Sequence, residues 1–151
     1  MKIPSGLGLK PDPNFTSDER LFRRIDPDHI DQDNHVMASA VEDIQERQPS
    51  CSFNRGKYSD PEEVLDPAHP ELNRIAYLMA GNLPAPVPHP VNPQDKFGFR
   101  LEHLPKETNY SHTEVQVTRN AAAASKLKNP ELRRQLREAL AEKMFVLELI
   151  A

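Results

Sequence analysis

The chain has 151 residues, of which 37% are hydrophobic, 28% charged and 6% aromatic, and its formal net charge is -4. This length fits one domain of ordinary size, no apolar run approaches the ~18 residues of a membrane-spanning helix, and no segment typical of a secretory signal opens the sequence. The single cysteine, Cys51, excludes an internal disulfide and a multi-cysteine zinc site, and the negative charge gives no general attraction to nucleic acid. We therefore expect a soluble cytoplasmic protein without a bound cofactor.

Proline is the compositional outlier, with 15 residues against 5 glycines, which is about twice the usual proline share of about 5%. Three prolines lie in residues 1–15, which have little periodicity and are predicted to form an extended N-terminal arm. Five more lie in residues 83–93, where alternating proline keeps each preceding residue out of the helical region and predicts an extended segment near polyproline II. A single folded domain is expected over residues 16–151.

The first half of this domain is predicted to be mainly helical. Leu21 and Ile25 are four residues apart, a spacing that favours a helix over a strand for their segment. Further along, an N-capping residue, a proline and two glutamates are typical of a helix start at Ser59. The predicted elements are a helix at 18–25 (with a strand at 20–25 as the alternative), a loop at 26–34, a helix at 36–47, a strand at 51–57 and a short helix at 59–65.

The second half is predicted to contain a sheet and the longest helix. Period-two alternation in two segments predicts an antiparallel hairpin, and Asn129-Pro130-Glu131 is typical of a helix N-terminus. The predicted elements are a buried strand at 74–79, hairpin strands at 96–103 and 111–118, a helix at 129–143, and a strand or helix continuation at 144–150. The expected fold is therefore a single small α+β domain with a hairpin-containing antiparallel sheet, a C-terminal helix, an N-terminal arm and an extended proline segment.

Two sets of reactive side chains are predicted to be structural. His103, His112 and Glu114 have a spacing that suits a two-histidine, one-carboxylate metal site. Alternation along the hairpin strands, however, places His112 and Glu114 on the face opposite the core and His103 on the core face, so we expect no metal site. Arg100 is then expected to pair with Glu114 across the strands. Cys51 is predicted to be a small buried hydrophobic residue rather than a nucleophile.

A third set is defined by its order along the chain: an arginine in the first regular element, a serine in a later strand, and Glu114 in the hairpin. This order is similar to the arginine–serine–glutamate arrangement of ADP-ribosyltransferases. In that family the arginine holds the phosphates of the dinucleotide, the serine buttresses the site and the glutamate orients the ribose. The resemblance implies a small enzyme acting on a nucleotide-type substrate, while the alternative is that the arginines are surface or ion-paired residues. The candidate catalytic residues are Arg24, Ser52, His112 and Glu114, with Arg23 and Ser50 as possible replacements for the first two.

The C-terminal third carries a local excess of positive charge. Between residues 119 and 137 there are six lysines and arginines and one acidic residue, Glu131. A basic helix face can contact RNA, DNA or an acidic partner, although such a face more often is simply solvated. The candidate nucleic-acid contacts are Arg133, Arg134 and Arg137.

The extended segments suggest a different function. Proline-rich segments lose little conformational entropy on docking and often serve as recognition strands. The leading expectation is therefore a non-catalytic interaction module, such as an accessory subunit of a larger assembly, whose partner is another protein chain and not a membrane. The candidate partner-binding residues are Pro84, Pro86, Pro88 and Pro90. The nucleotide-directed enzyme and the nucleic-acid contact are the alternatives.

Overall fold

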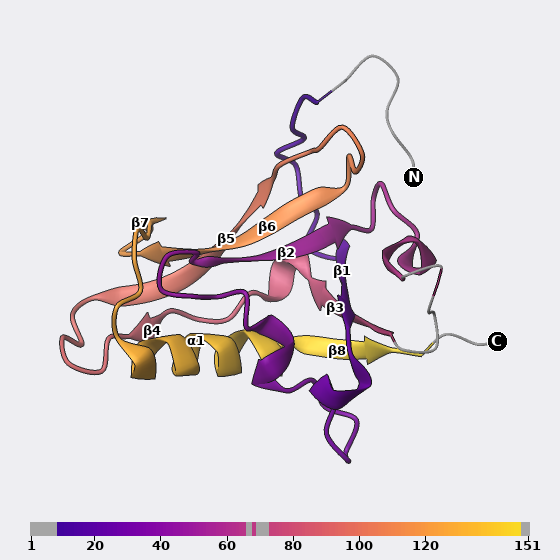
Figure 1. Ribbon diagram of the computed structural model, residues 1–151. Helices are drawn as coiled ribbons and strands as arrows, with labels where there is room; N and C mark the ends of the chain where they lie inside the picture. Colours follow the sequence, from indigo (N-terminus) through magenta and orange to yellow (C-terminus); the bar gives the residue numbers. More distant parts are fainter. Residues whose placement is uncertain (1–8, 66–67, 69–72, 149–151) are drawn as a thin grey trace.

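The computed structural model describes residues 9–65, 68 and 73–148. Within these residues the strands are β1 (Arg20–Ile25), β2 (Ser50–Arg55), β3 (Arg74–Met79), β4 (Val87–Pro88), β5 (Lys96–His103), β6 (His112–Arg119), β7 (Ala122–Ala123) and β8 (Met144–Leu147). They form one curled antiparallel sheet in the order β4-β5-β6-β2-β1-β3-β8, with β7 paired to β6. The helix α1 (Pro130–Glu142) lies along one face and leads directly into β8 (Figure 1). The domain is thus α+β, but mostly sheet.

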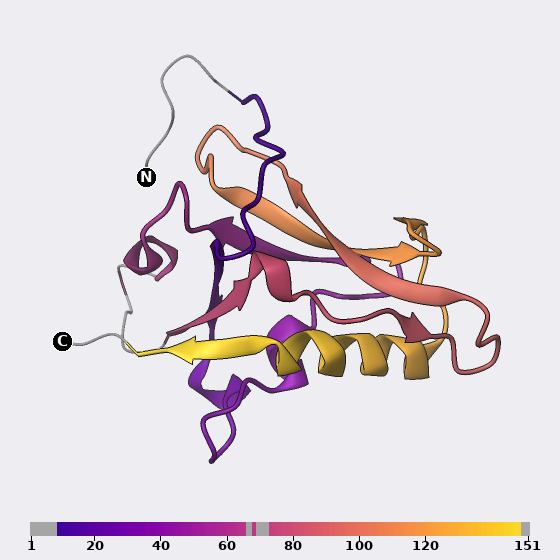
Figure 2. The same cartoon turned by 180° about the vertical axis from the view of Figure 1, so that it is seen from behind.

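The hydrophobic core contains side chains of this curled sheet and of α1, and the reverse view shows α1 running beside the sheet (Figure 2). We call the sheet face that contacts α1 the core face and the opposite face the outer face. Alternation along the strands assigns every second side chain to one face. The buried side chains of the core face include Leu21, Ile25, Cys51, Phe53, Val115 and Val117, and α1 contributes Leu132, Leu136 and Leu140. Across the described residues, no helix is long and apolar enough to cross a membrane.

The preferred helix at 18–25 is wrong, and the alternative, a strand at 20–25, is confirmed as the inner strand β1. It pairs with β3 over its whole length, from Arg20 opposite Met79 to Ile25 opposite Arg74. Leu21 lies on the core face together with Ile25, because a spacing of four residues is also two repeats of a strand. The same apolar spacing therefore fits both structures, and pairing with β3 selects the strand.

The predicted helix at 36–47 is reduced to the 3-10 helix η2 (Ala38–Val41) between two isolated β-bridges. Val41 and Ile44 are still fully buried, as an amphipathic helix would have required. They pack in the core with α1, and the Arg137 guanidinium donates to the Ile44 carbonyl at 2.7 and 3.0 Å. Tertiary packing therefore satisfies the apolar pattern without a regular helix.

The short helix predicted at 59–65 begins as expected but extends for only one turn. Asp60 and Glu63 form a capping box around the 3-10 helix η3 (Pro61–Val64). The Asp60 amide donates to the Glu63 carboxylate at 3.0 Å. The sequence signal thus marks where the turn starts, although not its helix type or length.

Several predicted elements are confirmed. The strand β3 has the predicted bounds, β2 matches the predicted strand at 51–57 within two residues, and β5 pairs with β6 as the expected antiparallel hairpin. The Asn129 side chain caps α1 by accepting from the Leu132 amide at 2.9 Å. The segment after α1, for which a strand and a continued helix were both possible, is the strand β8. Residues 149–150 of this predicted element lie outside the described residues.

The proline segment includes the edge strand β4, which is extended as predicted, whereas residues 90–93 bend and turn toward β5. Val87 lies opposite Phe97 of β5, and the His89 amide donates to the Asp95 carbonyl at 2.9 Å. Because backbone groups alternate in direction along a strand, the nitrogen atom of Pro88 faces away from β5. The outer edge of β4 therefore presents a proline where an N–H donor would otherwise project.

The described part of the predicted arm, residues 9–15, has no regular strand or helix and contacts the domain through Arg55. This arginine is fully buried at the end of β2 and forms a two-pronged ion pair with Glu19, both distances being 2.8 Å. It also donates to the carbonyls of Asp12 and Asn14 at 2.6 and 2.8 Å. The His103 Nδ1 atom accepts from the Asp12 amide at 2.9 Å. Residues 1–8 of the predicted arm lie outside the described residues.

Candidate functional site

Three of the four predicted catalytic side chains meet on the outer face. Ser52 of β2 lies directly opposite Glu114 of β6 in the strand register. The Ser52 hydroxyl donates to Glu114 Oε1 at 3.0 Å, and His112 Nε2 lies 2.9 Å from the same oxygen. His112 is two positions from Glu114 in the sequence, whereas Ser52 is 62 positions away. The pairing of β2 with β6 is therefore what brings Ser52 into the site.

Only one oxygen of the Glu114 carboxylate has hydrogen-bond partners among the described residues. Its Oε1 atom has both partners, whereas Oε2 is buried and has no hydrogen-bond partner within the described structure. Burial acts to raise the pKa of Glu114, but the hydrogen bonds from His112 and Ser52 outweigh it and hold the pKa below its usual value. The group is therefore ionised at neutral pH.

A cleft of about 440 Å3, which we call the outer-face cleft, opens beside Ser52. It exists because β1 and β2 pair only at Leu21–Arg55 and Phe22–Asn54 and then diverge. Its lining comes from β1, β2, η3 and the segment after η2, namely Phe22, Arg23, Arg24, Ser52, Phe53, Asn54, Glu63, Val64 and Asp43. His112 and Glu114 do not line the cleft but are linked to its wall through Ser52.

The two neighbouring arginines of β1 have different roles. Arg23 donates to the carbonyls of Ala40 and Ser52, both at 2.9 Å, and its Nη2 atom lies 3.1 Å from the Asp43 carboxylate. Its guanidinium thus fills the gap where β1 and β2 diverge. Arg24 is exposed, lines the same cleft, and has no hydrogen bond or ion pair with another described residue. Of the two arginines, Arg24 is therefore the one that can bind a ligand.

The remaining reactive side chains have structural partners. His103 lies on the core face, where its Nε2 atom is 2.6 Å from the Tyr110 carbonyl. Within the described ranges, no group of three histidine, cysteine or acidic residues is placed to hold a metal ion. The expected pairing of Arg100 with Glu114 is wrong, because Arg100 contacts Gln116 at 3.3 Å. Burial raises the pKa of Cys51 to about 12, so its thiol stays protonated at neutral pH.

Each arginine of the predicted nucleic-acid surface already contacts the protein. Arg133 donates to the Leu127 carbonyl at 2.5 Å, and Arg137 binds the Ile44 carbonyl. Arg134 forms ion pairs with Glu131 and Glu138 on its own helix. The helix face is therefore locally neutralised around Arg134, and two of the three guanidinium groups are committed to backbone acceptors.

The predicted partner-binding prolines follow the edge of the sheet. Pro84 and Pro86 line a shallow hollow with Phe99 and Arg100, while Pro88 and Pro90 are exposed. Leu83 and Val87, which alternate with them, pack against the core. The segment is thus anchored to the domain through its non-proline residues.

Sequence analysis missed the buried Arg55 cluster. A signal was present, because Cys51, Phe53 and Arg55 alternate on one face of the same strand. An arginine in register with two buried apolar residues predicts a paired internal charge. Its partners Asp12, Glu19 and His103 come from three separate segments and could not be identified without the fold.

No protein-family model, curated protein or solved structure matches this chain. The arguments for its function therefore come from the geometry of the described residues.

Proposed function

We propose that the chain binds a nucleotide-type substrate at the outer-face cleft and acts on its ribose. The observation that carries this proposal is the hydrogen-bonded set of Ser52, His112 and Glu114, which reaches the wall of the cleft through Ser52. A ribose hydroxyl in the cleft could exchange a hydrogen bond with the Ser52 hydroxyl. Ser52 and His112 both bind Glu114 Oε1 and so orient the carboxylate.

Arg24 supplies the complementary group for the phosphates. A guanidinium can donate two parallel hydrogen bonds to a phosphate, and that of Arg24 is uncommitted at the edge of the cleft. Of the other charged groups of the cleft, Arg23 pairs with Asp43, and the Glu63 carboxylate accepts from the Asp60 amide. The cleft volume of about 440 Å3 lies within the range of about 300–1,000 Å3 typical of small-molecule sites.

The proposed reaction is cleavage of an N-glycosidic bond, as the order of arginine, serine and glutamate in ADP-ribosyltransferases suggests. The bond between ribose C1′ and the departing base nitrogen breaks, and the electron pair leaves with the base. Water adds its oxygen to C1′ and releases a proton. The ionised Glu114 would stabilise the positive charge that develops on the ribose in the transition state.

The experiment titrates the full chain with NAD+ by isothermal calorimetry and follows release of nicotinamide by chromatography. Replacing Arg24→Gln should weaken binding by roughly tenfold, because a charged hydrogen bond to phosphate is lost. Glu114→Gln should abolish nicotinamide release while leaving the phosphate contact in place. Arg20→Gln is the matched control, since Arg20 is an exposed arginine on the same face of β1 outside the cleft. Absence of saturable NAD+ binding, or equal weakening by Arg20→Gln, would contradict the proposal.

The function as an interaction module stays a prediction, and we rank it below the proposed action on a nucleotide. Its argument depended on two extended segments, and the described parts of both make contacts within the chain. The nucleic-acid contact also stays a prediction. Its three arginines have intramolecular partners that a nucleic acid would have to replace.

A further inference from the structure

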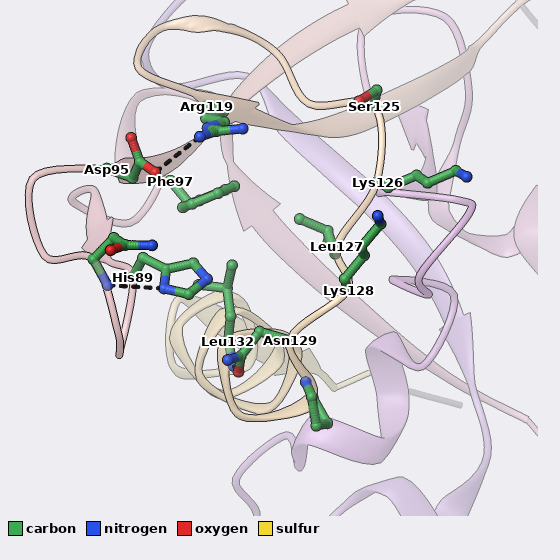
Figure 3. Close-up of a pocket in the computed structure, with 12 residues that line it drawn as sticks. His89, Asp95, Phe97, Arg119, Ser125, Lys126, Leu127, Lys128, Asn129 and Leu132 are labelled. Atoms are coloured by element: carbon green, nitrogen blue, oxygen red, sulfur yellow. Dashed lines mark hydrogen bonds and ion pairs between the residues drawn. The ribbon is translucent and has the colours of Figure 1, made fainter.

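A second cleft lies far from the polar set of the outer face. It has a volume of about 650 Å3 and opens between the turn that joins β4 to β5 and the segment that leads into α1 (Figure 3). We call it the turn–linker cleft and define it by His89, Phe97, Arg119, Leu127, Lys128 and Leu132. It shares no lining residue with the outer-face cleft.

The floor of the turn–linker cleft is apolar. Phe97, Leu127 and Leu132 line it and belong to the buried core, so they present a fixed hydrophobic surface. The His89 ring lies beside Phe97, with 6.0 Å between ring centroids. This floor suits a flat apolar group, because stacking and burial of such a group need no polar partner.

The polar groups around this floor are mainly hydrogen-bond donors. His89 Nδ1 accepts from the amides of Val91 and Asn92 at 3.0 and 3.2 Å, which leaves the ring proton on Nε2 as a donor. Arg119 shares the rim with Lys128, and one of its guanidinium nitrogens binds Asp95 at 2.9 Å.

Negative charge at this rim is already compensated. Among the residues that the structure describes, Asp95 is the one acidic residue that lines the cleft, and it is paired with Arg119 and Asn120. These hydrogen bonds hold the pKa of Asp95 below its usual value. The charges that remain are positive, because Lys126 and Lys128 have no hydrogen bond or ion pair with a described residue.

We propose that the turn–linker cleft binds a small organic anion, in which a carboxylate or phosphate is attached to a flat apolar body. The apolar body would lie on Phe97 and Leu127, and the anionic group would accept from His89 Nε2 and Lys128. Affinity for such a ligand requires both its apolar body and its anionic group. The floor residues Phe97 and Leu127 offer no polar partner, and the charged groups of the rim offer no apolar surface.

The experiment titrates benzoate and phenyl phosphate separately into the 15N-labelled full chain, with benzyl alcohol as the neutral analogue. Both anions should saturate and shift the amides of residues 89–97 and 125–129, whereas benzyl alcohol should bind at least tenfold more weakly. Saturation by one anion only would assign the anionic group as carboxylate or phosphate. Absence of saturation by both, or equal binding of the alcohol, would overturn the proposal.

Two variants and two controls test the assigned contacts. His89→Asn keeps an acceptor for the turn amides but removes the Nε2 donor, and Lys128→Gln removes the rim charge, so each should weaken anion binding by roughly threefold to tenfold. Lys106→Gln, an exposed lysine outside the cleft, should change nothing, and an equal loss there would overturn the proposal in favour of nonspecific attraction. Arg24→Gln should also leave anion binding intact, which separates this site from the proposed nucleotide site.

Discussion

Arg55 has no exposed surface, yet every one of its guanidinium nitrogens has an acceptor. Glu19 neutralises the charge, and the carbonyls of Asp12 and Asn14 complete the hydrogen bonds. The ring of Phe15 covers the guanidinium, 3.9 Å from its central carbon. A buried arginine is tolerated only with such full pairing, because the cost of removing its charge from water is several kcal/mol.

Replacing Arg55→Met should destabilise the fold by about 3–5 kcal/mol, because it leaves the Glu19 carboxylate buried without a counter-charge. Urea unfolding followed by circular dichroism measures this loss. The double variant Arg55→Met with Glu19→Leu removes both charges and should recover part of it. A double variant as unstable as the single one would show that the carbonyl contacts of the arm, rather than the ion pair, carry the effect.

His103 links the arm to the hairpin and gives the fold a pH dependence. Burial lowers the pKa of His103, and the nearby Arg55 charge lowers it further, with Asp12 and the Tyr110 carbonyl acting in the opposite direction. The ring also stacks on Tyr58. The folded-state pKa therefore lies below the value of about 6.5 for histidine in an unfolded chain.

The free energy of unfolding should consequently fall as the pH falls from about 6.5 through the lowered pKa of His103, because the unfolded chain binds more protons in this window. Urea unfolding between pH 5 and pH 8 measures the slope. His103→Asn keeps an acceptor for the Asp12 amide but cannot titrate, and it should flatten the slope. An unchanged slope in this variant would assign the pH dependence to other groups.

At the scale of elements, the proline of β4 has a structural explanation. An edge strand exposes unpaired N–H groups that can pair with another chain, and proline removes such a donor. In β4 Pro88 occupies the outward position, while the amide of His89, just after the strand, donates to Asp95. The proline that suggested a recognition strand thus makes this edge a poorer template for strand addition.

Restoring the outward donor of β4 should promote self-association. In the variant Pro88→Val, one amide becomes available on the outer edge of the sheet, and we expect concentration-dependent oligomers beyond those of the parent chain. Light scattering coupled to size-exclusion chromatography measures this. Pro93→Val is the control, because Pro93 lies in the turn rather than in β4. Equal association by the control would point to a general loss of stability instead.

The helix predictions for residues 18–25 and 36–47 changed for two different reasons. Apolar residues four apart fit a helix turn and also two strand repeats, so Leu21 and Ile25 could not decide the structure of β1 by themselves. In the segment after it, Val41 and Ile44 are buried by α1 without forming a regular helix. Helix α1 was predicted well because its capping residue, proline and apolar stripe all agree.

At the scale of the whole molecule, the two faces of the curled sheet carry different kinds of side chains. The core face contains the apolar residues that contact α1 and, at one end, the Arg55 cluster. The outer face contains Ser52, His112 and Glu114, whose polar contacts lie beside a cleft rather than within the core. The set of Ser52, His112 and Glu114 thus lies on the side of the sheet opposite α1.

The sequence by itself determined the local features: the hairpin of β5 and β6, the start of α1, the extended proline segment, and the shared face of His112 and Glu114. Each depends on periodicity or on neighbours within a few residues. Only the tertiary structure decided that Ser52 lies opposite Glu114, that Arg24 rather than Arg23 is uncommitted, and that Arg55 is buried. These depend on which strands pair and where β1 and β2 diverge, and contacts between residues 29 to 62 positions apart leave no local pattern.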